Sequence, residues 1–306
     1  MKILKIVTLV LLLSGFIFYF FPVPEKDFGE LYDADDEVEA SLLKFRETAT
    51  QTLKVGEVNW QYYSGGTGDR AILFLHGMGG AYDIWWQQIE ALKDSFRIIS
   101  TTCPAVNNLE DAIEGLSAIL EKEGISKVSI VGSSMGGYMA QYFTIKYPEK
   151  VDKLVLGNTF PPNDVYAKQN GGIRSMLPFI PEWLIMSMFR SNLSTKVTPF
   201  SGNSPLVEAY LLEQYYGHMS KKQFMGRLDM VLEQFEPSVG KPAILAIPKL
   251  IIKSDNDPLV SPVLREALVA MYPEATIFTF QGKGHFPYLN ASAVYTEQLS
   301  DFLLRL

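Results

Sequence analysis

Gly132-Ser133-Ser134-Met135-Gly136 is the stretch that decides the fold, because a short apolar run at 128–131 precedes it and a helix-like segment at 135–147 follows it. The pattern G-x-S-x-G between a strand and a helix is typical of a nucleophile elbow. The sharp turn strains the backbone of the nucleophile, so the positions two before and two after it must be very small. Gly132 and Gly136 meet that need around Ser134. We therefore predict that Ser134 is a nucleophile.

Short apolar runs alternate with helix-length segments on both sides of this turn. We expect strands at 58–63, 71–75, 97–101, 128–131, 154–156, 250–253 and 276–280, and helices at 83–92, 109–123, 135–147, 262–271 and 293–304. Strands that alternate with helices predict a parallel sheet with right-handed crossovers. The alternation stops near residue 160, and a segment of helical pattern rich in aromatic residues and Met follows. The expected fold class is α/β, with a mostly parallel central sheet flanked by helices and a helical cap insertion.

The oxyanion hole of such a fold needs two backbone donors near the nucleophile. One donor is expected to be the N–H of Met135, directly after Ser134. The other should come from the glycine-rich loop after the buried strand at 71–75, where Gly77 lets the backbone turn inward and Met78 is the best candidate amide. His76 in the same loop is a less favoured candidate for a chemical role, since a histidine at such a position more often holds the loop in place.

The base must be one of three histidines, His76, His218 and His285. In this fold the chain order is Ser, then Asp or Glu, then His. His285 follows the last expected strand in a loop flanked by glycine, whereas His218 lies in the cap segment and reads as a surface or packing residue. The orienting acid should follow the strand at 250–253, where Asp257 is preferred over Asp255 because it opens the turn beside a proline.

Composition excludes several other classes of protein. The net charge of −7 disfavours a nucleic-acid partner, which needs a basic surface. A single cysteine, Cys103, excludes an intrachain disulfide and any CxxC metal site. The three histidines are too dispersed for a zinc cluster. We therefore expect neither a metal nor a cofactor.

The N-terminal segment is predicted to be a transmembrane signal anchor over residues 1–24. The run 6–21 is almost purely apolar, with lysines before it and acidic residues after it. The positive-inside rule then places the N-terminus in the cytoplasm and the globular part outside it, in a periplasm or lumen. A cleaved signal peptide is the alternative, although no small-x-small site follows the run. Residues 25–54 are expected to form an acidic tether and lead-in. The α/β core is expected at 55–160 and 240–306, with the helical cap at 161–239.

Four segments in this order carry a family resemblance, namely Leu75-His76-Gly77, Gly132-Ser133-Ser134-Met135-Gly136-Gly137, Asp257-Pro258-Leu259-Val260 and Gly284-His285-Phe286. They resemble the α/β-hydrolase superfamily over nearly everything from residue 55 to the end. Within it the chain is similar to maspardin-like proteins in stretches such as 156–160 and 285–289. Maspardin is generally regarded as an interaction protein with incomplete hydrolase machinery. This chain keeps Asp257 and His285, which favours catalysis.

The expected function is that of a serine hydrolase, most simply a carboxylesterase or lipase acting on a small-molecule ester with an apolar acyl group. Ser134 argues against the aspartate-nucleophile dehalogenases and epoxide hydrolases of the superfamily. The apolar cap stretch 176–186 can line an acyl pocket or meet the membrane, and simple packing of cap helices explains it equally well. Two alternatives stay open: a C–C bond hydrolase with the same three residues, and a non-catalytic scaffold that binds a protein partner through the cap.

Overall fold

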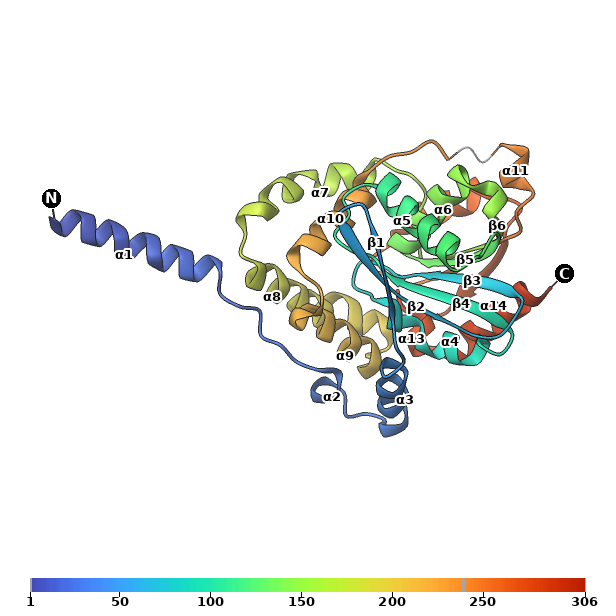
Figure 1. Cartoon of the computed structure of the whole chain (residues 1–306), viewed down its shortest axis with the longest axis horizontal. Helices are drawn as coiled ribbons and strands as arrows, with labels where there is room; N and C mark the ends of the chain where they lie inside the picture. The colour runs from blue at the N-terminus through green and yellow to red at the C-terminus, as the bar shows by residue number, and fades with distance from the viewer. Residues whose placement is uncertain (1, 238–239, 306) are drawn as a thin grey trace.

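An eight-stranded sheet forms the centre of the computed structural model, which describes residues 2–237 and 240–305 (Figure 1). The strand order is β1-β2-β4-β3-β5-β6-β7-β8. β1 pairs antiparallel with β2, and β2 with β4, while all other neighbours are parallel, so the predicted mostly parallel sheet is confirmed. The strands are β1 Gln51–Val55, β2 Val58–Gly65, β3 Arg70–Leu75, β4 Phe96–Thr102, β5 Val128–Ser133, β6 Val151–Gly157, β7 Lys249–Ser254 and β8 Thr276–Phe280.

Helices cover both faces of this sheet. The core helices are α4 Trp86–Leu92, α5 Leu109–Lys122, α6 Met135–Lys146, α11 Pro242–Leu245, α12 Pro262–Met271, α13 Pro287–Asn290 and α14 Ser292–Leu304, with 3-10 turns η1 Tyr82–Trp85 and η2 Pro148–Lys150. Side chains of β3 alternate between two buried clusters because successive residues of a strand point to opposite faces. Leu73 and Leu75 join one cluster, and Ile72 and Phe74 the other.

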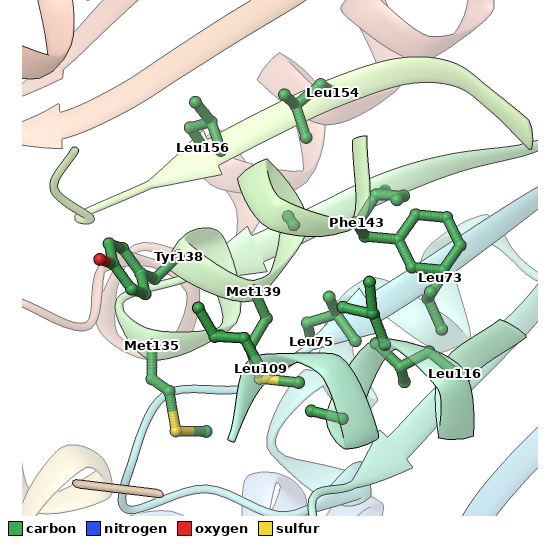
Figure 2. Close-up of a cluster of buried hydrophobic side chains, with 14 of the residues drawn as sticks. Leu73, Leu75, Leu109, Leu116, Met135, Tyr138, Met139, Phe143, Leu154 and Leu156 are labelled. Atoms are coloured by element: carbon green, nitrogen blue, oxygen red, sulfur yellow. The ribbon is translucent and has the colours of Figure 1, made fainter. Parts of the chain in front are cut away.

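Figure 2 shows the first of these clusters, in which strand leucines meet side chains of α5 and α6. Phe143 and Met139 of α6 and Leu116 of α5 are almost fully buried there. Burial of one such side chain stabilises the fold by about 1.5–3 kcal/mol. This packing fixes α6 directly against the sheet, and α6 begins next to Ser134.

The cap is the helical insertion between β6 and β7. It contains α7 Val165–Met176, α8 Glu182–Asn192, α9 Pro205–Glu213 and α10 Lys221–Leu232, with the short helical turns η3 Leu177–Phe179, η4 Leu193–Val197, η5 Thr198–Ser201 and η6 Gln214–His218. Its own small core is formed by Leu177, Ile185, Met186, Met219, Phe224 and Leu228. The helical cap expected from the sequence is therefore present, although Ser238 and Val239 of the expected range 161–239 lie outside the described residues.

Helix α1, Lys2–Tyr19, projects away from the rest of the molecule (Figure 1). None of its residues is buried, and it is long and apolar enough to cross a membrane by length and composition. In the part of the chain that the structure describes, its last turn and the residues just after it contact the cap. The Tyr19 hydroxyl donates to the Pro178 carbonyl at 2.5 Å, and the Trp183 indole donates to the Phe18 carbonyl at 2.8 Å.

The segment after α1 is more structured than the expected acidic tether. It forms α2 Phe28–Leu31 and α3 Asp36–Arg46 before β1. Phe28 has no exposed surface, and Leu42 and Phe45 of α3 are also buried against the core. The sequence signal for α3 was the helical spacing of Leu42 and Phe45 after the N-cap Asp35, which the surrounding acidic residues obscured.

A buried charged network joins this segment to the cap and the core. The Arg46 guanidinium donates to both carboxylate oxygens of Glu213 at 2.8 and 2.6 Å, and to Asp83 at 2.7 Å. Glu213 also accepts from the Phe28 N–H at 2.8 Å, and Asp83 from the Tyr210 hydroxyl at 2.5 Å. Glu213 is only 1% exposed. Its charge is therefore compensated within the protein and not by water.

We predict that Glu213→Ala destabilises the protein by about 3 kcal/mol, because Arg46 then keeps a largely buried charge without its main partner. Urea unfolding of the full-length protein in detergent, followed by tryptophan fluorescence, measures the loss. The matched control is Glu90→Ala, which breaks the exposed Glu90–Lys93 pair and should change stability by less than about 1 kcal/mol. Equal effects of the two substitutions would contradict the role assigned to the network.

Candidate active site

Ser134 occupies the turn between β5 and α6 with φ 54° and ψ −120°. A positive φ is unfavourable for a residue with a Cβ atom and persists only where the surroundings hold it. Two hydrogen bonds do so. The Ser134 N–H donates to the Gly157 carbonyl at 2.9 Å, and the Thr159 hydroxyl donates to the Ser134 carbonyl at 2.6 Å. The end of β6 therefore fixes the backbone of the predicted nucleophile.

Glycines around Ser134 allow the backbone segments to approach this closely. A Cβ atom at Gly132 would lie 2.4 Å from the Gly136 carbonyl oxygen, and one at Gly136 would lie 2.2 Å from the Leu75 carbonyl oxygen. Both distances are far inside van der Waals contact. Gly77 lies against the serine itself, since its Cβ would be 3.2 Å from the Ser134 Cβ. The three glycines singled out from the sequence thus stand where a side chain would not fit without a shift.

His285 and Asp257 form a buried pair in the loops after β8 and β7. The His285 Nδ1 lies 2.9 and 2.8 Å from the two carboxylate oxygens of Asp257. An ionised carboxylate only accepts hydrogen bonds, so Nδ1 donates to Asp257, which leaves Nε2 as the acceptor whenever the ring is neutral. The side chains are 3% and 0% exposed, respectively. The structure therefore brings together two residues that lie 28 positions apart and were predicted as base and acid.

The Asp257 carboxylate is held by further donors. The N–H groups of Leu259 and Val260 donate to Oδ1 at 2.8 and 3.1 Å, and the Asn158 amide donates to Oδ2 at 2.9 Å. Burial by itself would raise the pKa of Asp257, but the neighbouring His285 and these donors outweigh it and lower the pKa. Asp257 is therefore ionised at neutral pH.

Asn158 is the site residue that sequence reasoning missed. It follows β6, has a φ of 41°, and is 1% exposed. Its position directly after a strand, at the same sheet edge as Ser134, was the available signal, but its partner Asp257 lies 99 positions away. The less favoured candidate acid, Asp255, instead accepts from the Gly282 N–H at 2.8 Å, and its hydrogen bonds in the described residues do not include His285.

The two expected oxyanion donors come from two different segments, the start of α6 and the loop after β3. Met135 begins α6, so its N–H has no carbonyl partner within the helix. Met78 lies in the turn after β3, next to Gly77, and lines the same cavity as Ser134. Among the described residues neither N–H has a hydrogen-bond partner. Both amides are thus available to a ligand, and α6 adds the positive end of its dipole.

A cavity of about 440 Å³ opens on this site. This volume lies within the range that is typical of small-molecule pockets. Ser134 and His285 lie in its wall together with Met78 and Phe286. The cap supplies most of the remaining wall, including Phe189, Leu193, Val197, Met219, Phe224, Leu228 and Val231. The sequence segment 176–186, considered as a pocket wall, does not line the cavity; α8 contributes through its later residues instead.

The other two histidines have separate environments. His76 is 2% exposed, donates from Nδ1 to the Gly77 carbonyl at 2.5 Å, and accepts at Nε2 from the Cys103 N–H at 2.9 Å. Burial, aided by the charge of Arg227, lowers its pKa to about 3. It is therefore a neutral residue that holds the loop, as the sequence analysis favoured. The His218 side chain is 43% exposed, and its Nε2 lies 4.0 Å from the Oδ1 of Asp27.

Asp27, Glu213 and His218 are close enough together to hold a metal ion, but none of them lines the cavity. Both oxygens of Glu213 already accept from Arg46. A metal would have to displace that buried pairing, so these residues fit a metal poorly.

The depressed pKa of His76 predicts a pH effect on stability. The unfolded chain binds a proton below a pKa of about 6.5, while the folded protein does not until about 3, so stability falls as the pH falls between these values. Between pH 7 and pH 5 this one residue should remove about 2 kcal/mol. Urea unfolding at both pH values should show that loss in wild type and not in His76→Asn. Identical pH slopes in the two proteins would contradict the assignment.

The chain is 24% identical over 274 residues to a 2-hydroxy-6-oxononadienedioate/2-hydroxy-6-oxononatrienedioate hydrolase of Burkholderia vietnamiensis, covering 81% of this chain and 92% of that protein. An esterase of Thermogutta terrifontis superimposes with a TM-score of 0.71 at 22% identity, covering 84% and 98% of the two chains. A membrane phospholipase A, a bacterial virulence factor, superimposes with a TM-score of 0.67 at 16% identity, covering 99% and 97%.

Residues 70–292 match the family model of the alpha/beta hydrolase fold. This match spans more than half of the chain and includes Ser134, Asp257 and His285. The sheet order, the turn at Ser134 and the cap between β6 and β7 agree with it. The chain belongs to the α/β-hydrolase fold family.

Proposed function

We propose that this chain is a membrane-anchored serine hydrolase that cleaves a carboxylic ester with an apolar acyl group through an acyl-enzyme on Ser134. The observation that carries the proposal is the shared cavity. Ser134 and His285 lie in one wall of a cavity whose other lining side chains are mostly apolar. An apolar acyl chain can fill that space while its carbonyl carbon lies beside the serine.

In this mechanism His285 acts as the general base. Its Nδ1–H is held by Asp257, so Nε2 takes the Ser134 proton as the hydroxyl attacks the ester carbonyl. The carbonyl oxygen becomes an anion that accepts from the Met78 and Met135 N–H groups. The C–O bond then breaks, His285 returns the proton to the leaving alcohol, and a water activated by His285 releases the acid from Ser134.

Contacts of helix α1 support the membrane part of the proposal. Its 18 residues span about 27 Å, close to the thickness of a bilayer core. Where α1 meets the cap, Tyr19 of α1 donates to a cap carbonyl, and Trp183 of the cap donates to a carbonyl of α1. Tyrosine and tryptophan side chains favour the membrane–water interface. The cap residues Ile173, Met176 and Phe179 are 57%, 62% and 81% exposed. We place this edge of the cap at the membrane surface, with the N-terminus cytoplasmic and the hydrolase domain extracytoplasmic.

A C–C bond hydrolase is the second candidate, and the named activity of the Burkholderia relative supports it. Such enzymes use the same three residue types, and the substrate in that name is a dicarboxylate. Two carboxylates require cationic partners in the pocket. Lys196 is the one cationic side chain among the described residues that line this cavity. The apolar lining therefore favours the ester.

Purified full-length protein in detergent should hydrolyse p-nitrophenyl esters and prefer medium or long acyl chains to acetate. Ser134→Ala and His285→Ala should remove the activity, because the serine then lacks its nucleophilic oxygen or its base. Asp257→Asn should lower kcat by about 10²–10⁴-fold, since the amide no longer holds the productive tautomer of His285. Steady-state assays on each variant measure these effects.

Asp255→Asn is the matched control for Asp257→Asn, because the same substitution two positions away keeps an acceptor for the Gly282 N–H. It should retain wild-type kcat within about threefold. A 2-hydroxy-6-oxo-dienedioate should be turned over far more slowly than the best ester. Faster cleavage of the dienedioate would favour the C–C hydrolase, and wild type without activity on any ester would overturn the ester proposal.

The membrane anchor predicts the behaviour of the chain in cells. Full-length protein should stay with the membrane after an alkaline carbonate wash, and residues 25–306 should be released, because α1 is the one helix of the described residues that is long and apolar enough to span the bilayer. Protease added to sealed right-side-out vesicles should digest the hydrolase domain. Release of the full-length chain by carbonate would contradict the anchor, and protection of the domain would reverse its orientation.

A further inference from the structure

Arg227 of α10 is a cationic side chain that the proposed mechanism leaves unused. It is 1% exposed, among the largest fully buried side chains of the protein. None of its hydrogen-bond partners in the described residues is a carboxylate. Its guanidinium donates instead to the carbonyl oxygens of Met78 at 2.6 Å, Gly80 at 3.1 Å and Cys103 at 2.8 Å. A buried arginine without an acidic partner is costly, which points to a function.

The carbonyls it holds belong to the loop that carries one proposed oxyanion donor. The Met78 N–H is part of the Gly77–Met78 peptide, whose carbonyl oxygen accepts from His76 Nδ1 at 2.5 Å and from the Gly80 N–H at 3.1 Å. The next peptide, Met78–Gly79, is held through the Met78 carbonyl by Arg227. Both peptide planes that flank Met78 are therefore fixed, and with them the direction of its N–H.

This loop needs such support because it is rich in glycine. Gly77, Gly79 and Gly80 restrict their own backbone angles very little. Cys103 links the two supports, since its N–H donates to His76 and its carbonyl accepts from Arg227. His76 and Cys103 belong to the core, whereas Arg227 comes from the cap.

Helix α10 also approaches the core closely at Gly226, the residue before Arg227. A Cβ atom at Gly226 would lie 2.1 Å from the Val106 carbonyl oxygen, so a side chain there would push α10 away from the loop that follows β4. This contact lets the Arg227 side chain reach the loop at 77–80. Correct seating of the cap and correct geometry of the Met78 amide are thus coupled through one residue.

We propose that Arg227 is a positioning residue that fixes the Met78 amide through the Met78 and Gly80 carbonyls, so that the oxyanion hole is complete only when α10 is seated on the core. The inference rests on the proposed acyl-transfer function. Loss of one oxyanion donor lowers kcat by about 10²–10³-fold in acyl-transfer enzymes. Displacement of the Met78 amide should have an effect of that size on kcat and little effect on KM, because the oxyanion forms only in the transition state.

The test compares Arg227→Met and Arg227→Lys with wild type on the best p-nitrophenyl ester. Arg227→Met should lower kcat by about 100-fold with KM within threefold, and Arg227→Lys should recover part of the loss because an ammonium can still donate to the loop carbonyls. The matched control is Arg174→Met, which removes another cap arginine; Arg174 bonds to Asp229 of α10 and, among the described residues, donates no hydrogen bond to the loop at 77–80. Arg174→Met should keep kcat within threefold of wild type.

Inhibition by an alkylboronic acid separates positioning from a general loss of structure. The tetrahedral boronate on Ser134 needs the oxyanion hole, so its inhibition constant should rise in Arg227→Lys in proportion to the loss of kcat/KM, even if Arg227→Met does not fold. Unchanged kcat in a folded Arg227→Met, a rise in KM alone, or unchanged boronate inhibition in Arg227→Lys would overturn the inference. Absence of activity in wild type would instead overturn the proposed function.

Discussion

Ser134 holds a φ of 54°, a conformation that costs a residue with a side chain about 1–3 kcal/mol. The turn persists because Gly132 and Gly136 let β3, β5 and α6 approach to distances that exclude any Cβ, and because the end of β6 fixes the serine backbone. Packing of α6 on the sheet makes these contacts rigid (Figure 2). The proposed roles of His285, the cavity and the Met78 and Met135 amides all require that this turn presents Ser134 to them.

Buried charged side chains away from the serine connect other parts of the chain to the core. Arg46 and Glu213 join the segment after α1 to the cap, and Arg227 joins the cap to the loop at Met78. Helix α1 contacts the cap at Trp183. The cap is therefore connected on one side to the proposed membrane anchor and on the other to the proposed oxyanion hole. This arrangement supports the proposal of a membrane-anchored hydrolase.

The sequence predicted the fold well wherever a local pattern was decisive. Alternating apolar runs gave the parallel sheet, and the spacing of Gly132 and Gly136 identified the turn at Ser134. Long-range partners were not accessible in this way. Arg46 and Glu213 are 167 positions apart, and Arg227 meets Met78 across 149, so the sequence carries no local sign of either contact. The role of Asn158 was missed for the same reason. Helices α2 and α3 were missed for another reason, because acidic residues in and around them obscured the apolar spacing.

Reaction with a fluorophosphonate tests the central claim, that Ser134 is an activated nucleophile, most directly. Full-length protein in detergent is treated with the probe, and mass spectrometry of the digested protein locates the adduct. The account predicts one adduct per chain on Ser134, which is lost in Ser134→Ala and forms much more slowly in His285→Ala. A folded wild-type protein that stays unlabelled, or that is labelled elsewhere, would contradict the account and favour a non-catalytic scaffold.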